Sequence, residues 1–380
     1  MSQDEKPVVP AAASETSTPA APAASAAAAA PSAPAAVTEA GPPRWTKLVN
    51  WIFFGVAIAA LAWMIRSVGP RKVVDLVRSI GGGWFAILML LELGSYACDA
   101  AAIKAFMRPE SRMIDYLRVF AAQLSGAAIN LLMPTGKVGE ASKVTLMVRR
   151  APRGRVVSSV LLYNLWGFFL NVGIVVLGIP ITALFYHLPK KLEVAIWLAA
   201  GILLVLALLL LWLVTRGIGS SLVGFLRLVH VISPERRARW RARLVKLDGQ
   251  LKPTGPEASH GTGAGIGWML LSRVVGWVQA AIVIHLVVGD LDVMFLIATL
   301  SAGLVIAWVA AIVPMGIGVS EGGSYLIYEV LGATATAGLG VALIRRVRQV
   351  IIAVLGLALM LILQALDRAP PPIRKANPGY

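Results

Sequence analysis

Cysteine and histidine are almost missing from this sequence. Its 380 residues include one cysteine, Cys98, and four histidines. A single cysteine cannot form an intrachain disulfide, and these counts argue against a Cys-rich zinc site or a dense histidine–metal centre. The chain also lacks a phosphate-binding glycine loop and any metal-ligand motif. We therefore expect no cofactor.

Charged residues are scarce too, at 14% of the chain, against roughly a quarter in a typical soluble domain. Hydrophobic residues make up 58%, and the mean hydropathy is +0.77. The 35 Lys+Arg outnumber the 19 Asp+Glu, which gives a formal net charge of +16. A nucleic-acid binder would carry this charge without the apolar excess. The composition therefore indicates a polytopic membrane protein with basic loops, which binds no nucleic acid.

The first 43 residues differ from all that follows. Residues 1–43 are rich in alanine and proline and contain no large apolar run. Such a segment has too little apolar surface to offset the entropy of ordering it, so we expect a disordered tail. It also lacks the basic start and apolar core of a secretory signal. We expect residues 44–380 to form one transmembrane domain.

Apolar runs of membrane-crossing length recur after this tail. A crossing helix needs roughly 20 predominantly apolar residues. The sequence therefore predicts an all-α, polytopic integral membrane protein with about eight spanning segments. These segments cover approximately residues 48–65, 84–107, 114–133, 155–186, 192–214, 266–288, 292–312 and 334–366.

Residues 215–260 form the one long hydrophilic connection. Within it, basic residues between Arg236 and Lys246 are interleaved with apolar residues that would form one helical stripe from Trp240 to Leu251. The pattern fits either an ordinary positive-inside loop or a basic amphipathic helix that binds anionic lipid headgroups. Both interpretations place the loop in the cytoplasm.

Two segments break the apolar pattern in the same way, one in each half of the chain. Residues 130–143 and 313–323 each contain a proline, a glycine two residues later, and a further glycine and a glutamate within the next five residues. Irregular backbone is tolerated at membrane depth only inside protein or along a wet cavity, and such a pair is typical of a transporter's central site. We predict two re-entrant segments related by an inverted repeat, each followed by a shorter helix whose N-terminus faces an anion. The alternative is two ordinary loops at the membrane surface.

Three arginines fall within the last predicted span. Arg345, Arg346 and Arg348 lie about 17–21 Å along that helix, where a buried arginine should face a cavity or an acidic partner. Alternatively, residues 334–344 lie outside the membrane and residues 349–366 cross it alone.

Other polar side chains also fall within spans. Glu92, Tyr96 and Asp99 share one helix face, and they could pair with these arginines or with Lys143. The remaining polar groups, which interhelical hydrogen bonding explains about as well as ligand contact, are Asn130, Asn164, Asn171, Arg273 and Gln279.

A nucleophile pattern appears in the second broken segment. Gly318, Ser320 and Gly322 match G-x-S-x-G, and His285 is the one histidine placed to serve as a base. No strand is predicted before this segment, and its glycines already act as helix breakers. We therefore expect that the protein is not an enzyme, with an intramembrane serine hydrolase as the least favoured function.

These motifs resemble the lysylphosphatidylglycerol synthase transmembrane, or flippase-like, family. Its first-half pattern matches Asn130, Pro134, Gly139, Glu140 and Lys143, although Lys143 stands where the family has arginine. Its second-half pattern matches Pro314, Gly318 and Glu321, followed by Arg345 or Arg346. The stretch 318–323, together with Arg345 to Arg348, most resembles the branch found with hopanoid biosynthesis genes. We do not expect the soluble transferase domain of the family's enzymes in these 380 residues.

The resemblance implies lipid translocation or lipid binding in a bacterial inner membrane. We expect a polar intramembrane cavity for a phospholipid or hopanoid-type headgroup; the alternative is a non-transporting scaffold that recruits partners through its basic loop and tail. The residues expected to bind or transport lipid are Asn130, Pro134, Gly136, Lys137, Gly139, Glu140, Lys143, Pro314, Gly316, Gly318, Glu321, Arg345 and Arg346, with Glu92, Asp99 and Arg273 in support.

Overall fold

The computed structural model describes residues 80–133, 138–186, 190–216, 256–290, 292–310 and 318–368, together with Arg66 and Arg78. All of them belong to one compact unit, Trp51–Tyr380. The predicted tail 1–43, the first predicted span and nearly all of the basic loop lie outside the described residues. So do five predicted site residues: Pro134, Gly136, Lys137, Pro314 and Gly316.

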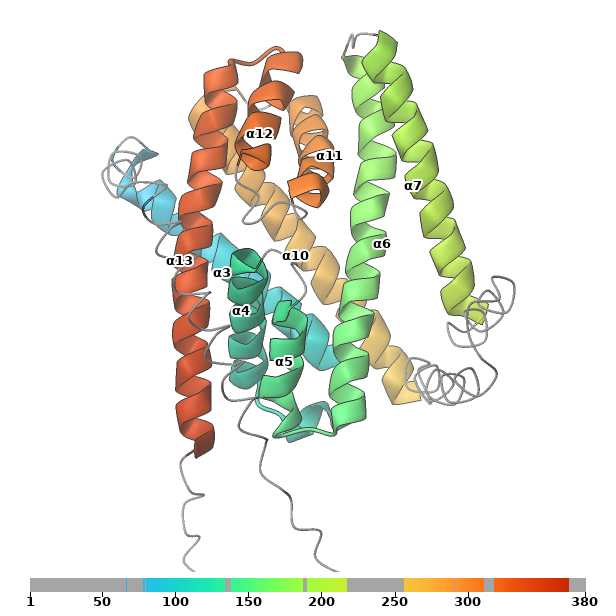
Figure 1. Cartoon of the computed structure of the whole chain (residues 1–380), viewed down its shortest axis with the longest axis vertical. Coiled ribbons are helices and arrows are strands. Elements are labelled where there is room, and N and C mark those ends of the chain that lie inside the picture. The colour runs from blue at the N-terminus through green and yellow to red at the C-terminus, as the bar shows by residue number, and fades with distance from the viewer. Residues whose placement is uncertain are drawn as a thin grey trace, which may run out of the picture. The chain divides into compact units, whose positions relative to one another are not determined.

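The described part of the chain is helical and contains no strand, as the sequence predicted (Figure 1). Its helices are α3 (Gly82–Phe106), the short 3-10 helix η1 (Glu110–Met113), α4 (Tyr116–Leu132), α5 (Val138–Val148), α6 (Arg153–Phe185), α7 (Lys190–Arg216), α10 (Pro256–Val288), α11 (Val293–Ala310), α12 (Val319–Val330) and α13 (Ala335–Arg368).

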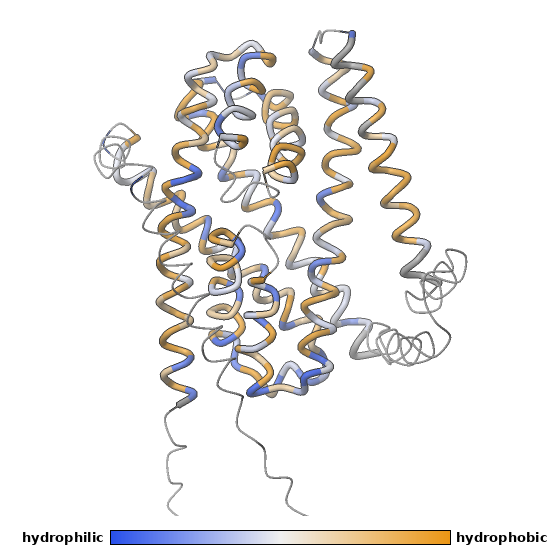
Figure 2. The backbone as a smooth tube through the Cα atoms, in the orientation of Figure 1, coloured by the Kyte–Doolittle hydropathy of each residue, from blue (hydrophilic) through white to orange (hydrophobic). Residues whose placement is uncertain are grey.

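Five of these helices are long and apolar enough to cross a membrane, judged within the described residues: α3, α6, α11, α13 and residues Ser259–Val288 of α10. Large apolar side chains such as Leu90, Leu177 and Leu184 are mostly exposed on these helices, as expected where lipid is the solvent. Figure 2 shows the same character in α6 and α7, which are hydrophobic along most of their length. The protein is therefore a polytopic all-α membrane protein.

The helix boundaries differ from the predicted spans in three places. Helix α4 covers the predicted span 114–133 with 17 residues, fewer than the roughly 20 of a full crossing. Helix α7 carries a shorter apolar stretch, Ala200–Trp212. Helix α10 begins at Pro256, so the last residues of the predicted connection 215–260 are helical. Proline suits the first turn of a helix, where its missing N–H is not needed.

Helices that are distant in sequence pack against one another. Extensive contacts of this kind join α3 to α10, α4 to α13 and α6 to α11. Among neighbours in sequence, α5 packs on α4 and α12 packs on α13. Gly356 of α13 shows how close two helices approach, because a Cβ there would lie 2.4 Å from the Leu124 carbonyl oxygen of α4. Small residues at such crossings are typical of membrane helix packing.

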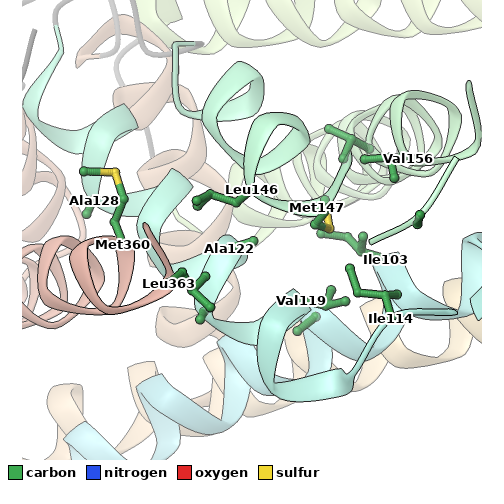
Figure 3. Packing of buried hydrophobic residues seen from close by; sticks show 14 of the residues in the cluster. Ile103, Ile114, Val119, Ala122, Ala128, Leu146, Met147, Val156, Met360 and Leu363 are labelled. Atoms are coloured by element: carbon green, nitrogen blue, oxygen red, sulfur yellow. The ribbon is translucent and has the colours of Figure 1, made fainter. Parts of the chain in front are cut away.

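The largest group of buried apolar side chains lies where α3, α4, α5, α6 and α13 meet. Figure 3 shows side chains from these helices converging, among them Ile103, Val119, Met147, Val156 and Met360. This core fixes the short helix α5 against its neighbours, and so positions the polar residues that follow the first break.

Candidate functional site

Glu140 is the centre of a polar cluster at the first broken segment, residues 130–143, which we call the first break. Its Oε1 accepts hydrogen bonds from Asn130 Nδ2 at 3.0 Å and Lys143 Nζ at 2.9 Å. Its Oε2 accepts one from Asn164 Nδ2 at 2.9 Å. The carboxylate therefore joins α4, α5 and α6. Three donors satisfy it, as a partly buried carboxylate requires.

Two glycines let α5 lie directly on α4 at this cluster. A Cβ on Gly139 would lie 2.0 Å from the Gly126 carbonyl oxygen, and a Cβ on Gly126 would lie 2.4 Å from Lys143 side-chain atoms. The Gly139 N–H donates to Asn130 Oδ1 at 2.8 Å. The Asn130 side chain thus satisfies a backbone donor at the start of α5, where the helix itself supplies no acceptor.

Lys143 is almost fully buried, with 3% of its surface exposed. Besides its ion pair with Glu140, its Nζ lies 5.4 Å from the centre of the Tyr163 ring. The Tyr163 hydroxyl accepts from Gln123 Nε2 at 3.2 Å and also interacts electrostatically with Asp99 of α3. These contacts connect the first break to α3 through one aromatic side chain.

The second break leads into α12 through Gly318, whose φ of +82° favours glycine. The Gly318 N–H donates to Glu321 Oε2 at 2.8 Å, and Glu321 Oε1 pairs with Arg346 at 2.8 Å. Glu321 therefore has two roles: it caps the first turn of α12, and it neutralises an arginine of α13.

The two arginines that flank Arg346 in α13, Arg345 and Arg348, have different partners. Arg345 donates from Nη2 to Ser324 Oγ of α12 at 2.7 Å. Arg348 pairs with Glu92 of α3 at 3.5 Å. Helix α13 runs unbroken through this stretch, which Figure 2 shows as a hydrophilic section in the upper half of a mostly hydrophobic helix.

A cavity of about 340 Å³ lies beside these arginines, between α3, α6, α10, α11, α12 and α13. Its charged lining residues are Arg273, Arg345 and Arg348, and no carboxylate is found among the lining residues that the structure describes. The uncharged polar groups that line it are Ser95, Asn171, Ser272, Gln279, Thr299, Ser324 and Tyr328.

The predicted site residues divide between two places. Arg273 and Arg345 line the cavity, and Glu92 lies one contact away through Arg348. Glu321 pairs with Arg346, which is not among the lining residues. Asn130, Gly139, Glu140 and Lys143 form the separate cluster behind the first break. Asp99 lies between the two, because it interacts electrostatically with Arg273, which lines the cavity, and with Lys143 of the cluster.

Several cavity residues were not predicted from the sequence as site residues. Ser95, Ser272, Thr299 and Ser324 are small hydroxyl residues within apolar helices, where they commonly bond to the backbone of their own helix. Tyr328 follows the spacing of a core residue, and 1% of its surface is exposed. Sequence patterns do not distinguish such cavity residues from residues that only pack against neighbouring helices.

The predicted nucleophile and base lie at helix ends. Ser320 is in the first turn of α12, and His285 is in the last turn of α10, where it is exposed. Within the described residues, no group of three or more His, Cys, Asp or Glu could hold a metal ion.

Fold and site together define a polytopic helical membrane protein with an arginine-lined cavity inside its helix bundle. A family model of the lysylphosphatidylglycerol synthase TM region matches residues 50–356, and the chain belongs to this family. The family resemblance is thus confirmed, while the hopanoid-associated branch stays a prediction. Comparisons with curated proteins and with solved structures found no match.

Proposed function

We propose that this protein moves a polar lipid between the two leaflets of a membrane, with the headgroup passing through the arginine-lined cavity. The observation that carries the proposal is the cavity itself: about 340 Å³ in volume and lined by Arg273, Arg345 and Arg348. A headgroup in such a cavity keeps polar contacts while its acyl chains stay in hydrocarbon.

The energetics support a functional role for these charges. An arginine or carboxylate at the centre of a membrane helix costs about 2.5–3.5 kcal/mol on insertion scales. Replacing a buried ion pair with apolar residues is often neutral or stabilising. Pairs such as Glu92–Arg348 and Glu321–Arg346 therefore contribute little to holding the helices together, which favours a functional role for these charges beside the cavity.

Reconstitution into liposomes tests the proposal. We expect wild-type protein to equilibrate a labelled phospholipid between leaflets faster than protein-free liposomes do, and Arg345→Gln to slow it at least tenfold. Arg112→Gln is the matched control, because Arg112 is exposed on η1, away from the cavity. Wild-type protein that moves no lipid would contradict the proposal.

The membrane, the orientation and the lipid partners are also part of the proposal. The family resemblance favours a bacterial inner membrane, and the basic residues of the loop 215–260 favour the cytoplasmic side, where they would meet anionic lipid. A single cysteine placed in this loop, in a Cys98→Ser background, should react with a thiol reagent only from the cytoplasmic side.

The scaffold alternative places function in the basic loop and the tail 1–43 instead. Deleting residues 1–43 and neutralising the arginines of 236–243 should abolish the function of a scaffold and leave lipid movement largely intact. We further propose that the chain is not a hydrolase. A serine-reactive probe that labels the wild type but not Ser320→Ala would contradict this.

A further inference from the structure

We infer that the cavity binds a phosphate monoanion, carried by a phospholipid whose headgroup has no compensating positive charge. The inference rests on the proposed function and deepens it, because it selects one class of lipid. It disfavours both an uncharged polar lipid and a cationic, aminoacylated one.

The first argument is the charge balance around the cavity. The charged side chains here are partly buried, and four arginines face three carboxylates. Glu92 pairs with Arg348 and Glu321 with Arg346, while Asp99 interacts with Arg273 without an ion-pair contact. Arg345 is the fourth arginine. Among the described residues it has no carboxylate within ion-pair distance. The set therefore carries one uncompensated positive charge.

A single bound phosphodiester would balance that charge. A phosphodiester carries one negative charge at neutral pH, whereas a sugar or polyol carries none. An uncompensated charge in a site of low dielectric is unfavourable, and a partner of opposite charge removes much of the cost. The nearby Lys143 does not alter the balance, because Glu140 pairs with it.

The second argument is the supply of hydrogen-bond donors. The Nε atoms of Arg273, Arg345 and Arg348 are buried and meet no acceptor among the described residues. The buried hydroxyl of Tyr328 is unpaired in the same sense, and it also lines the cavity. Guanidinium groups match phosphate oxygens in geometry and bind them with charge-assisted hydrogen bonds.

The third argument concerns the lipids that the cavity rejects. With no carboxylate in its described lining, an amine on the headgroup would meet arginines and no partner of opposite charge. Like-charge contacts of this kind discriminate strongly between ligands. The cavity therefore disfavours an aminoacylated headgroup of the sort the family description contains.

Binding and transport measured on the same full-length protein test the inference. Purified protein is exchanged into nanodiscs of an uncharged diacylglycolipid host, doped with phosphatidylglycerol, lysylphosphatidylglycerol or diacylglycerol, and bound lipid is counted by native mass spectrometry. We expect phosphatidylglycerol to bind at least tenfold more tightly than either of the others. Arg345→Gln should remove this preference, Arg345→Lys should restore part of it, and Arg112→Gln should leave it unchanged.

Two further measurements distinguish a lipid ligand from a soluble anion, and this inference from the proposed function. Glycerol phosphate and inorganic phosphate, added in water, should displace the lipid only weakly; displacement at equal concentration would assign the site to a soluble anion and overturn the inference. Equal or tighter binding of lysylphosphatidylglycerol would also overturn it, even if lipid transport is observed. Selective binding of phosphatidylglycerol without any transport would instead refute the proposed function and leave this inference standing.

Discussion

At the scale of single residues, the two breaks place a glutamate in different surroundings. Glu140 is held by three donors from three helices, in a cluster closed by Gly126 and Gly139. Glu321 caps a helix end and pairs with one arginine. The first cluster is therefore built to hold α4 and α5 together, and the second lies next to the cavity.

Adding a methyl group at Gly139 should force α5 away from α4. The new Cβ would lie 2.0 Å from a backbone oxygen, which cannot move aside as a flexible side chain would. We expect Gly139→Ala to destabilise the protein by about 1–3 kcal/mol, the usual cost of overpacking, seen as a lower thermal midpoint in detergent. Gly173→Ala in α6 is the control, since its Cβ would meet nothing within 4 Å. Equal midpoints for both variants would contradict the close contact.

Replacing one partner of the Lys143–Glu140 pair should destabilise the protein more than replacing both partners. Glu140→Gln leaves a buried ammonium group without a charge partner, and losses of about 3–5 kcal/mol are typical. The double variant Glu140→Gln, Lys143→Met removes the charge as well, so we expect it to be more stable than the single variant. Thermal denaturation of both variants measures the difference, and a double variant no more stable than Glu140→Gln would count against a buried pair.

At the scale of helices, the sequence predicts where helices form better than it predicts which side chains meet between them. Periodicity and apolar length correctly predicted helices over seven described spans, and Pro/Gly spacing correctly predicted the short helices α5 and α12. The sequence pattern gave no way to choose whether Glu92 or Asp99 pairs with Arg348, because that depends on where the fold places α3 relative to α13. Ser95, Ser272 and Tyr328 escaped prediction for the same reason: only helix packing brings them to one cavity.

Substitutions of Glu321, in the first turn of α12, can separate its two roles. Glu321→Gln keeps an oxygen that can accept from the Gly318 N–H but loses the charge that pairs with Arg346. We expect the helix to form normally, with amide hydrogen exchange in its first turn unchanged, while lipid transport falls at least tenfold. Glu321→Ala should lose both, with faster exchange as well. Transport that survives Glu321→Gln would show that the ion pair is not needed.

At the scale of the whole molecule, most of the unusual composition has an ordinary cause. The apolar excess belongs to membrane helices, and the basic loop accounts for much of the formal charge of +16. The composition does not reveal a small set of charges around one cavity, in which four arginines face three carboxylates. Among the described residues, Arg273 and Arg345 line this cavity without a carboxylate at ion-pair distance. The account therefore depends on whether a lipid headgroup enters that cavity.

Photo-crosslinking gives the most direct test of that central claim. Phosphatidylglycerol with a photoreactive headgroup is reconstituted with the wild-type protein, and the modified residues are mapped by mass spectrometry. We predict adducts at cavity residues of two helices, Thr299 of α11 and Ser324 of α12, which excess unlabelled phosphatidylglycerol suppresses. Adducts confined to the helix ends and the exposed apolar faces, with none in the cavity, would contradict the account.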